Sequence, residues 1–375
     1  MKQTFISNLK NILGASTKRK LVIFSIDDYG NIRLDSAEAL KHLKNDGVQP
    51  KDRFDEFDAL ETTEDLEHLF DVLRSVKDKN KRHAVFTPYA LPCNINFQKT
   101  LEERAYVPET LPQTWKRLQN EQPKAYNGIE NILQQGIKEQ IFIPQFHGRE
   151  HVNINLLNRH LAAGDSTVTT NLKNKSLIAV SKRKDMPDVG FNQSFAFWDT
   201  AETKAHREIL TDGLQKFKDV YGYATTAFTP PAQQLHPELY SFLEAGGVQA
   251  IDKPLFTKRH LGFGKFKNEF NTLGKHSGQN HLTLVRNVLF EPNNGNKDHV
   301  GTALKQIEAA FRWGKPANIS SHRVNYCGHI EPQNRKQSLT QLKELLKRIS
   351  KRWPDVEFLS IDELIKEMVN SNAKN

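Results

Sequence analysis

The segment Leu21-Val22-Ile23-Phe24-Ser25-Ile26-Asp27-Asp28-Tyr29-Gly30 joins a β-branched apolar run to two adjacent carboxylates. The run over 21–26 predicts a buried strand, and Gly30 favours a turn after it. Adjacent carboxylates repel each other unless a cation or a hydrogen-bond donor lies nearby. A divalent cation bound by one of them would leave the other free as a base. An Asp pair that caps the following turn is the structural alternative.

Outward from this strand, short β-branched runs alternate with amphipathic stretches along nearly the whole chain. Strands are expected at 21–26, 84–87, 141–146, 225–229, 248–251, 282–290, 317–320 and 356–359. Helices are expected at 36–44, 63–77, 129–136, 154–162, 203–221, 237–245, 300–313, 338–351 and 361–369. This alternation predicts an α/β fold with a parallel sheet, either open or closed into a barrel.

Three of the expected strands run into residues that bind metals or carry protons, namely Asp27-Asp28, His147 and His322. In parallel α/β folds the functional groups gather where strands end and loops begin. A fourth strand ends at Thr229 and leads into Pro230-Pro231, whose rings fix the path of a loop. The sequence therefore predicts one site built from several strand ends.

His147 and His151 are four residues apart, so we expect both on one face of a helical turn. Neutral imidazoles at this spacing suit Zn²⁺, although two surface histidines at a helix start are the alternative. With Asp28 they would form a set of one carboxylate and two imidazoles, with open positions for water and substrate. His322 is suited to act as a general acid, and a satisfied, partly buried histidine is its alternative.

Size and composition set the class of protein. The chain has 375 residues, of which 37% are hydrophobic and 26% charged, which is typical of a soluble globular protein. The sequence contains no apolar run long enough for a membrane helix and no apolar core of a signal peptide. Only Cys93 and Cys327 are cysteines, which fits a reducing compartment, and we expect a cytoplasmic protein.

The formal charge of +9 comes from scattered basic clusters, at 18–20, 77–82 and 182–184. Aromatic residues are not interleaved with them, so we expect no nucleic-acid partner. We expect one domain over 1–375, with a core at about 20–368 and insertions at about 92–126 and 164–199. An aromatic cluster near the end of the second insertion is either a platform for sugar rings or ordinary core; it comprises Phe191, Phe195, Phe197 and Trp198.

Taken in order, these motifs resemble those of the polysaccharide deacetylases of the NodB-homology superfamily, which fold as an irregular (β/α)7 barrel. That family opens with Phe-Asp-Asp at a strand end, continues with His-x-x-x-His and a Pro-Pro loop, and closes with Leu-x-His. Positions 26–28, 147–151, 229–231 and 320–322 follow this order, and the tail over 342–364 resembles the closing helix–strand–helix. The opening Asp-Asp-Tyr-Gly is also similar to that of the YdjC-like chitooligosaccharide deacetylases.

The resemblance implies a barrel with inserted loops and a metal-dependent hydrolase that removes an N- or O-linked acetyl group from a sugar or polysaccharide precursor. Asp28, His147 and His151 would hold the divalent cation, with Zn²⁺ expected, while Asp27 would be the general base and His322 the general acid. Around the substrate we expect Arg149, Pro231, Arg286, Arg323 and Tyr326.

The chain departs from the family at three places. Thr229 stands where the family's third motif has an arginine that orients the base, and Arg149, Arg286 and Arg323 are the candidates to replace it. Ala232-Gln233 replaces the small glycine-bearing end of that motif, and Ser320 replaces the leucine two residues before His322.

Two other functions compete with the deacetylase. A glycosidase on a similar barrel needs two carboxylates from separate strands, for which Asp27, Asp199, Asp252 and Glu291 are candidates. A carbohydrate-binding protein that has lost turnover would explain the missing arginine of the third motif.

Overall fold

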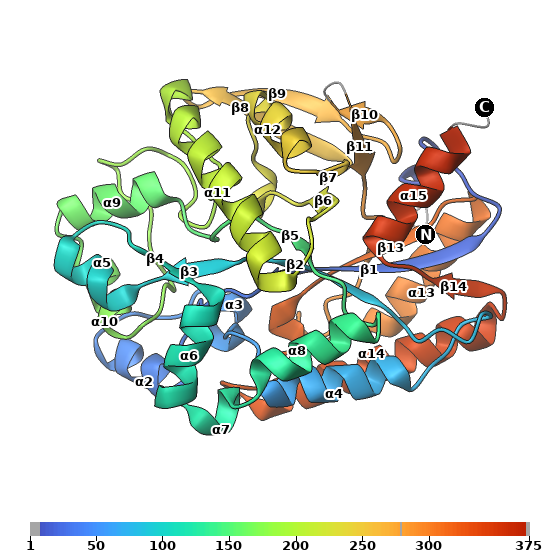
Figure 1. Cartoon of the computed structure of the whole chain (residues 1–375), viewed down its shortest axis with the longest axis horizontal. Coiled ribbons are helices and arrows are strands. Elements are labelled where there is room, and N and C mark those ends of the chain that lie inside the picture. Colours follow the sequence, from blue (N-terminus) through green and yellow to red (C-terminus); the bar gives the residue numbers. More distant parts are fainter. Residues whose placement is uncertain (1–7, 278–279, 373–375) are drawn as a thin grey trace.

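The computed structural model describes residues 8–277 and 280–372, and its centre is a ten-stranded, curled sheet (Figure 1). The strand order is β10-β11-β7-β6-β5-β2-β1-β13-β12, and β14 pairs with the first residues of β1. The strands are β1 (Lys20–Tyr29), β2 (Phe86–Ala90), β5 (Gln145–Phe146), β6 (Ala227–Phe228), β7 (Ala250–Asp252), β10 (His276–Ser277), β11 (His281–Leu284), β12 (Val288–Leu289), β13 (Ala317–His322) and β14 (Val356–Phe358).

All pairs in this sheet are parallel except β10 with β11. The sheet is open, and residues 285–287 carry the chain from β11 on one side of it to β12 at the opposite edge. The expected α/β architecture is confirmed, with the sheet curled into a half-barrel. Its strand ends converge because curling brings the carboxyl ends of separate strands around one mouth.

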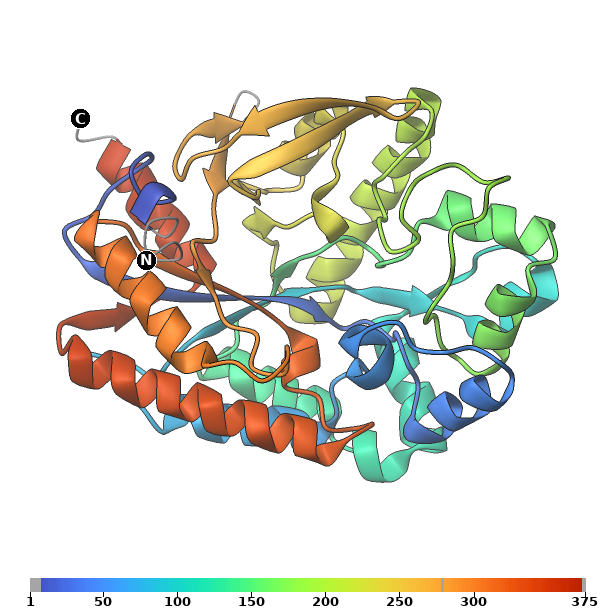
Figure 2. The same cartoon turned by 180° about the vertical axis from the view of Figure 1, so that it is seen from behind.

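Helices cover the outside of the sheet. In both views α4 (Thr63–Arg74) lies beside α14 (Pro332–Arg352), and α8 (Ile129–Lys138) lies beside α4 (Figures 1 and 2). The other long helices are α11 (Thr203–Tyr221), α13 (His299–Arg312) and α15 (Ile361–Asn372), and the shorter ones include α2 (Ala37–Asn45), α3 (Arg53–Phe57), α9 (Ile154–Ala162) and α12 (Tyr240–Ala245). No helix in the described ranges is long and apolar enough to cross a membrane.

The core explains why β1 reads as an unbroken apolar run. Every residue of β1 after Lys20 is buried, and the ring of Phe24 stacks on that of Phe86 in β2 with their centroids 5.2 Å apart. Strands covered on both faces have no solvent side, so they do not alternate between apolar and polar residues. This buried strand carries Asp27 and Asp28 at its carboxyl end.

The two expected insertions contain more regular structure than their sequence suggested. Within 92–126 lie β3 (Cys93–Ile95), α5 (Phe97–Glu103), β4 (Pro108–Thr110), α6 (Leu111–Glu121) and α7 (Pro123–Tyr126), and α10 (Ser166–Lys173) lies in the second segment. Helix α6 begins with a capping box between Thr110 and Gln113. A capping box marks the start of a helix, but the apolar residues that follow it are spaced too irregularly for a helix to be predicted from the sequence. A further unexpected element is the hairpin of β8 (Phe256–Gly262) and β9 (Lys265–Phe270).

Candidate metal centre

A β-bulge at the end of β1 brings two consecutive carboxylates to the mouth of the sheet. The pairing of β1 with β2 shifts between Ile26 and Tyr29, and Asp28 has a φ of 79°. In a regular strand, neighbouring side chains point to opposite faces, whereas a bulge re-aims one of them. A non-glycine residue with positive φ is uncommon and is typical of functional sites when its surroundings hold it. Asp27 and Asp28 are each only 7% exposed.

The two histidines meet Asp28 on the loop that follows β5. Asp28 Oδ1 lies 3.4 Å from His147 Nε2 and 3.1 Å from His151 Nε2. These three residues are a group in the described chain whose ligand atoms all lie within 4.8 Å of one another. Segments far apart in the sequence thus converge on one point.

The expected helical turn over His147 and His151 is wrong, because residues 147–151 form an irregular loop. Gly148 has a φ of 104°, and a Cβ at this position would lie 3.2 Å from the Phe195 ring. The histidines therefore come together through a glycine turn packed against Phe195 and Pro231, and not through helical periodicity.

A backbone carbonyl selects the proton position on His147. The distance from His147 Nδ1 to the carbonyl oxygen of Thr229 is 2.7 Å, so Nδ1–H donates and the lone pair of Nε2 faces Asp28. Burial alone would raise the pKa of Asp28, but its close contacts with the imidazoles of His147 and His151 outweigh burial and hold that pKa well below its ordinary value.

Two of the three separations between these donors are those expected around a four-coordinate metal ion. Ligand atoms about 2.0–2.1 Å from a metal ion lie about 3.3 Å from one another in tetrahedral geometry, and the two separations from Asp28 Oδ1 are 3.4 and 3.1 Å. Three protein ligands leave a position for water or substrate, as in catalytic zinc sites. The donor set and its spacing therefore suit a divalent cation.

Arg286 binds the second carboxylate. Its Nη1 and Nη2 donate to Asp27 Oδ2 and Oδ1, both at 2.7 Å, and its Nε lies 2.6 Å from Asp252 Oδ2 at the end of β7. Burial would raise the pKa of Asp27, but the charge and hydrogen bonds of Arg286 lower it below its ordinary value. Arg286 belongs to residues 285–287, which connect β11 to β12 across the open side of the sheet. Its Nη2 also donates to Thr229 Oγ1 at 3.2 Å.

His322 lies on the other side of Asp27 and is held by an acid that the sequence did not single out for this role. Its Nδ1 lies 2.7 Å from Glu291 Oε1, and its Nε2 lies 3.8 Å from Asp27 Oδ2. Glu291 is fixed in turn by Arg53 at 2.5 Å and by Asn325 at 2.8 Å. Burial lowers the pKa of His322, but Glu291 outweighs it and raises that pKa to about 9. The imidazole is thus protonated near neutral pH.

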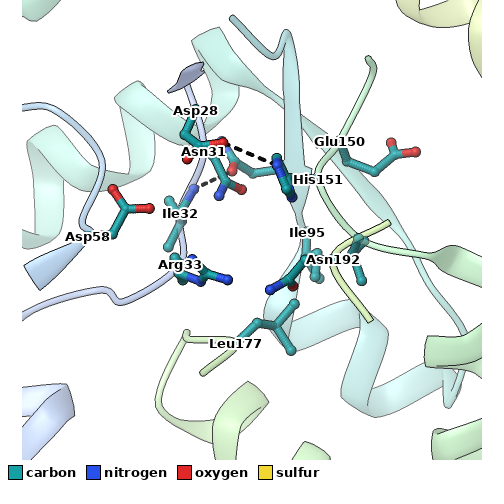
Figure 3. Close-up of a pocket in the computed structure, with 12 residues that line it drawn as sticks. Asp28, Asn31, Ile32, Arg33, Asp58, Ile95, Glu150, His151, Leu177 and Asn192 are labelled. Atoms are coloured by element: carbon teal, nitrogen blue, oxygen red, sulfur yellow. Dashed lines mark hydrogen bonds and ion pairs between the residues drawn. The ribbon is translucent and has the colours of Figure 1, made fainter. Parts of the chain in front are cut away.

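Two hollows of different size flank these groups. A narrow pocket of about 30 Å³ beside Asp28 and His151 has room for one or two waters, and Figure 3 shows Asp28 facing His151 above Arg33 and Leu177. A larger cavity of about 390 Å³ lies beside Asp27 and His322, which is within the size range of small-ligand sites.

Three residues expected around the substrate lie away from these hollows or inside the protein. The Arg149 guanidinium binds Glu150 at 2.6 Å and Asp212 at 2.8 Å, and Pro231 packs under Gly148. Arg323 has no exposed surface, because Asp58 and Glu61 each bind it at 2.9 Å. Their role at the substrate stays a prediction, and the contacts of these side chains support the loops of the site.

The remaining two residues expected at the substrate are Tyr326 and Arg286, and the sequence also offers Arg286 as a replacement for the arginine absent at position 229. Tyr326 is 2% exposed, with its hydroxyl 3.0 Å from that of Ser321, so it packs under the strand end and does not face a ligand. Arg286 lines the larger cavity, but both edges of its guanidinium are occupied by Asp27 and Asp252. Its geometry is that of a residue that positions Asp27.

Comparisons with known proteins gave structural matches alone. No protein-family model matches the chain, and no curated protein matches its sequence. A structure described as a polysaccharide deacetylase of Mycobacterium smegmatis shares 10% identity, with a TM-score of 0.47 over 96% of each chain. The peptidoglycan deacetylase PdaC of Bacillus subtilis shares 11% identity, with a TM-score of 0.39 over 95% of this chain and 94% of that one.

A 4-alpha-glucanotransferase of Thermococcus litoralis also matches, with 10% identity and a TM-score of 0.47 over 93% of this chain and 40% of that one. Solved polysaccharide deacetylases and family 4 carbohydrate esterases are thus among the structures that match over most of the chain. At such identities the likeness concerns the fold, and the chemistry of the site has to be argued from its own side chains.

Proposed function

We propose that this chain is a metal-dependent hydrolase that removes an acetyl group, N- or O-linked, from a sugar or polysaccharide precursor. The observation that carries the proposal is the convergence of Asp28, His147 and His151 beside a second, separately held carboxylate, Asp27. A divalent cation bound there supplies Lewis acidity, which lowers the pKa of water and polarises a carbonyl. Zn²⁺ is the ion that the two imidazoles and the tetrahedral spacing favour.

Asp27 is placed to accept a proton from the attacking water. The charge of Arg286 keeps Asp27 ionised, and the bidentate contact fixes the plane of its carboxylate. An ionised acid with a fixed orientation, next to the ligand Asp28, has the attributes of a general base.

His322 is placed to give a proton to the departing amine or alcohol. Glu291 holds Nδ1 and favours the charged imidazole, so Nε2–H remains to donate. His322 and Asp27 both line the larger cavity, which is where the sugar would be accommodated.

The acetylated sugar is proposed from the order of the motifs at 26–28, 147–151, 229–231 and 320–322. We place the protein in the cytoplasm, because Cys93 and Cys327 are both buried and unpaired. The glycosidase is less favoured, since its two carboxyl groups need no metal and it would leave the convergence of Asp28, His147 and His151 without a role. The main support for a carbohydrate-binding protein without turnover was the absence of an arginine at position 229. Arg286 supplies that arginine's contact with Asp27 from another segment, so this alternative is also less favoured.

Acetate release tests the proposal. Purified protein is stripped with a chelator, reloaded with Zn²⁺ and given acetylated chitooligosaccharides or acetylated xylan, with acetate and reducing ends measured in parallel. We expect acetate release that needs the metal and falls roughly 10²–10⁴-fold in Asp27→Asn. Asp219→Asn, on the exposed face of α11, is the matched control. Reducing ends without acetate would favour the glycosidase, and no turnover of either kind would contradict the hydrolase.

A further inference from the structure

The hairpin of β8 and β9 presents large apolar side chains to solvent. The exposed fractions are 71% for Phe256, 56% for Phe263, 56% for Phe266 and 42% for Phe270, and Leu261 between them is 43% exposed. Scattered single apolar residues are common on protein surfaces, but a cluster on one element marks an interaction site. Phe256 and Phe270 are cross-strand partners with ring centroids 5.1 Å apart.

The tip of the hairpin is held in a conformation that costs energy. Phe263 has a φ of 48° between Gly262 and Gly264, which have φ values of 97° and 70°. A bulky residue with positive φ is strained where glycine or asparagine would be relaxed. The Phe263 ring meets Trp198 edge-on, with centroids 6.2 Å apart, and still leaves 56% of its surface exposed. A strained and largely exposed aromatic residue points to a use outside the fold.

Contacts beneath the tip keep the rings outward. The Phe263 amide donates to the Trp198 carbonyl oxygen at 2.7 Å, and the Gly264 amide donates to His260 Nε2 at 3.0 Å. The buried His260 ring lies between Phe197 and Phe266, with centroid distances of 5.0 and 4.8 Å. The exposed rings are therefore carried on an anchored, preorganised support.

Basic side chains accompany the rings. Lys258, Lys265 and Lys267 are exposed, and none of them forms an ion pair with a carboxylate in 8–277 or 280–372. The acid of the hairpin, Glu269, is occupied by Arg259 at 2.6 Å. Side chains alternate along β9, so Lys265 and Lys267 lie on the face opposite Phe266 and Phe270, whereas Lys258 shares the face of Phe256. An edge that carries exposed rings and three ammonium groups without carboxylate partners is complementary to a surface that is negatively charged and apolar beneath.

The hairpin is also placed where a large surface can reach it. Both views show β8 and β9 along an outer edge of the molecule, opposite the layer of α4 and α14 (Figures 1 and 2). No other part of the described chain covers the rings at this edge to the point of burial, as their exposed fractions show.

We propose that the β8–β9 hairpin docks this protein onto an anionic phospholipid surface. The Phe rings enter the boundary between headgroups and acyl chains, and the lysines contact lipid phosphates. This docking is peripheral and reversible, and it does not depend on the reaction proposed for the metal centre. An acidic protein, a nucleic acid or a second copy of the chain would use only part of this combination of rings and charges.

Vesicle flotation of the full chain tests the proposal, with phosphatidylcholine vesicles that contain or lack phosphatidylglycerol. We expect flotation only with the anionic vesicles. Phe263→Asn with Phe266→Ser should lower the partition coefficient about tenfold or more, and Asn relaxes the strained φ, so the fold is kept. Changing Lys258, Lys265 and Lys267 to Gln should reduce it roughly fivefold per lysine.

Matched controls lie on other elements. Lys336, Lys343 and Lys347 on α14 are exposed, and their change to Gln removes the same charge. Leu13→Ser with Val369→Ser removes exposed apolar surface elsewhere. Both controls should float like the wild type, with thermal melting checked for every variant. The proposal is overturned if the wild type does not float, if the hairpin variants float equally well, or if the Phe change abolishes only self-association or only binding to DNA.

Discussion

At the scale of single residues, Arg286 shows how this site can work with a threonine at position 229. Its guanidinium is buried between Asp27 and Asp252, and Thr229 contributes one acceptor to it and a backbone acceptor to His147. A planar guanidinium that binds a carboxylate through two parallel hydrogen bonds fixes both its charge and its orientation. The geometry needed at Asp27 is thus supplied from another segment of the chain.

We expect Arg286→Gln to lower kcat by about 10²-fold while one equivalent of zinc is retained, because the change disturbs the base and not the ligands. Steady-state kinetics and elemental analysis of the same preparation check this. Arg74→Gln is the control, since Arg74 at the end of α4 binds Asp71 and Glu139 and contacts no residue of the site. Equal activity in the two variants would show that Arg286 does not position Asp27.

At the scale of elements, the sequence predicted which strands carry the site but not how the side chains are aimed. The run over 21–26 and the motifs that follow the expected strands led to Asp28, His147 and His151, because apolar periodicity and strand ends are local signals. The bulge at Asp28 and the loop at 147–151 depend on contacts with β2, Phe195 and Pro231, which lie far away in sequence. The helical reading of the two histidines was wrong for that reason.

Gly148→Ala tests the loop. A Cβ there meets the Phe195 ring at 3.2 Å on a backbone with φ of 104°, so we expect a loss of about 1–3 kcal/mol of unfolding free energy and a weaker affinity for zinc. Gly222→Ala is the control, because Gly222 has a φ of 85° but open space around it. That change should cost about 1 kcal/mol without altering zinc affinity. Zinc titration and denaturant unfolding separate the two effects, and equal zinc affinities for both variants would count against the loop's role.

At the scale of the whole molecule, alternation of apolar runs was enough to predict an α/β fold, since each expected strand overlaps an observed one. Arg286 was one of three arginines expected to orient Asp27, and the sequence could not choose among them. Glu291 as the partner of His322 and the β8–β9 hairpin were not predicted. The two pairs join residues 259 and 31 positions apart, and no pattern within one segment reports such contacts. The hairpin lies between two expected strands and has apolar residues on an exposed surface, which contradicts the usual pattern of burial.

Global stability should also depend on pH through His206 on α11. Burial lowers the pKa of His206 from 6.5 to about 4, and its Nδ1 has no hydrogen-bond partner in the described residues. Since the unfolded chain then binds more protons, the free energy of unfolding falls as pH drops from about 6.5 towards 4, by about 3 kcal/mol at most. His206→Leu should remove this part of the acid destabilisation. Urea unfolding of both proteins between pH 7 and 4.5 measures it, and identical pH slopes would exclude His206 as the cause.

The most direct measurement is anomalous diffraction at the zinc edge from crystals of the zinc-loaded protein. We expect one peak bonded to Asp28 Oδ1, His147 Nε2 and His151 Nε2, with Asp27 unbonded and still paired with Arg286. A peak held by other residues, or none at these three, would contradict the metal centre and with it the proposed hydrolysis.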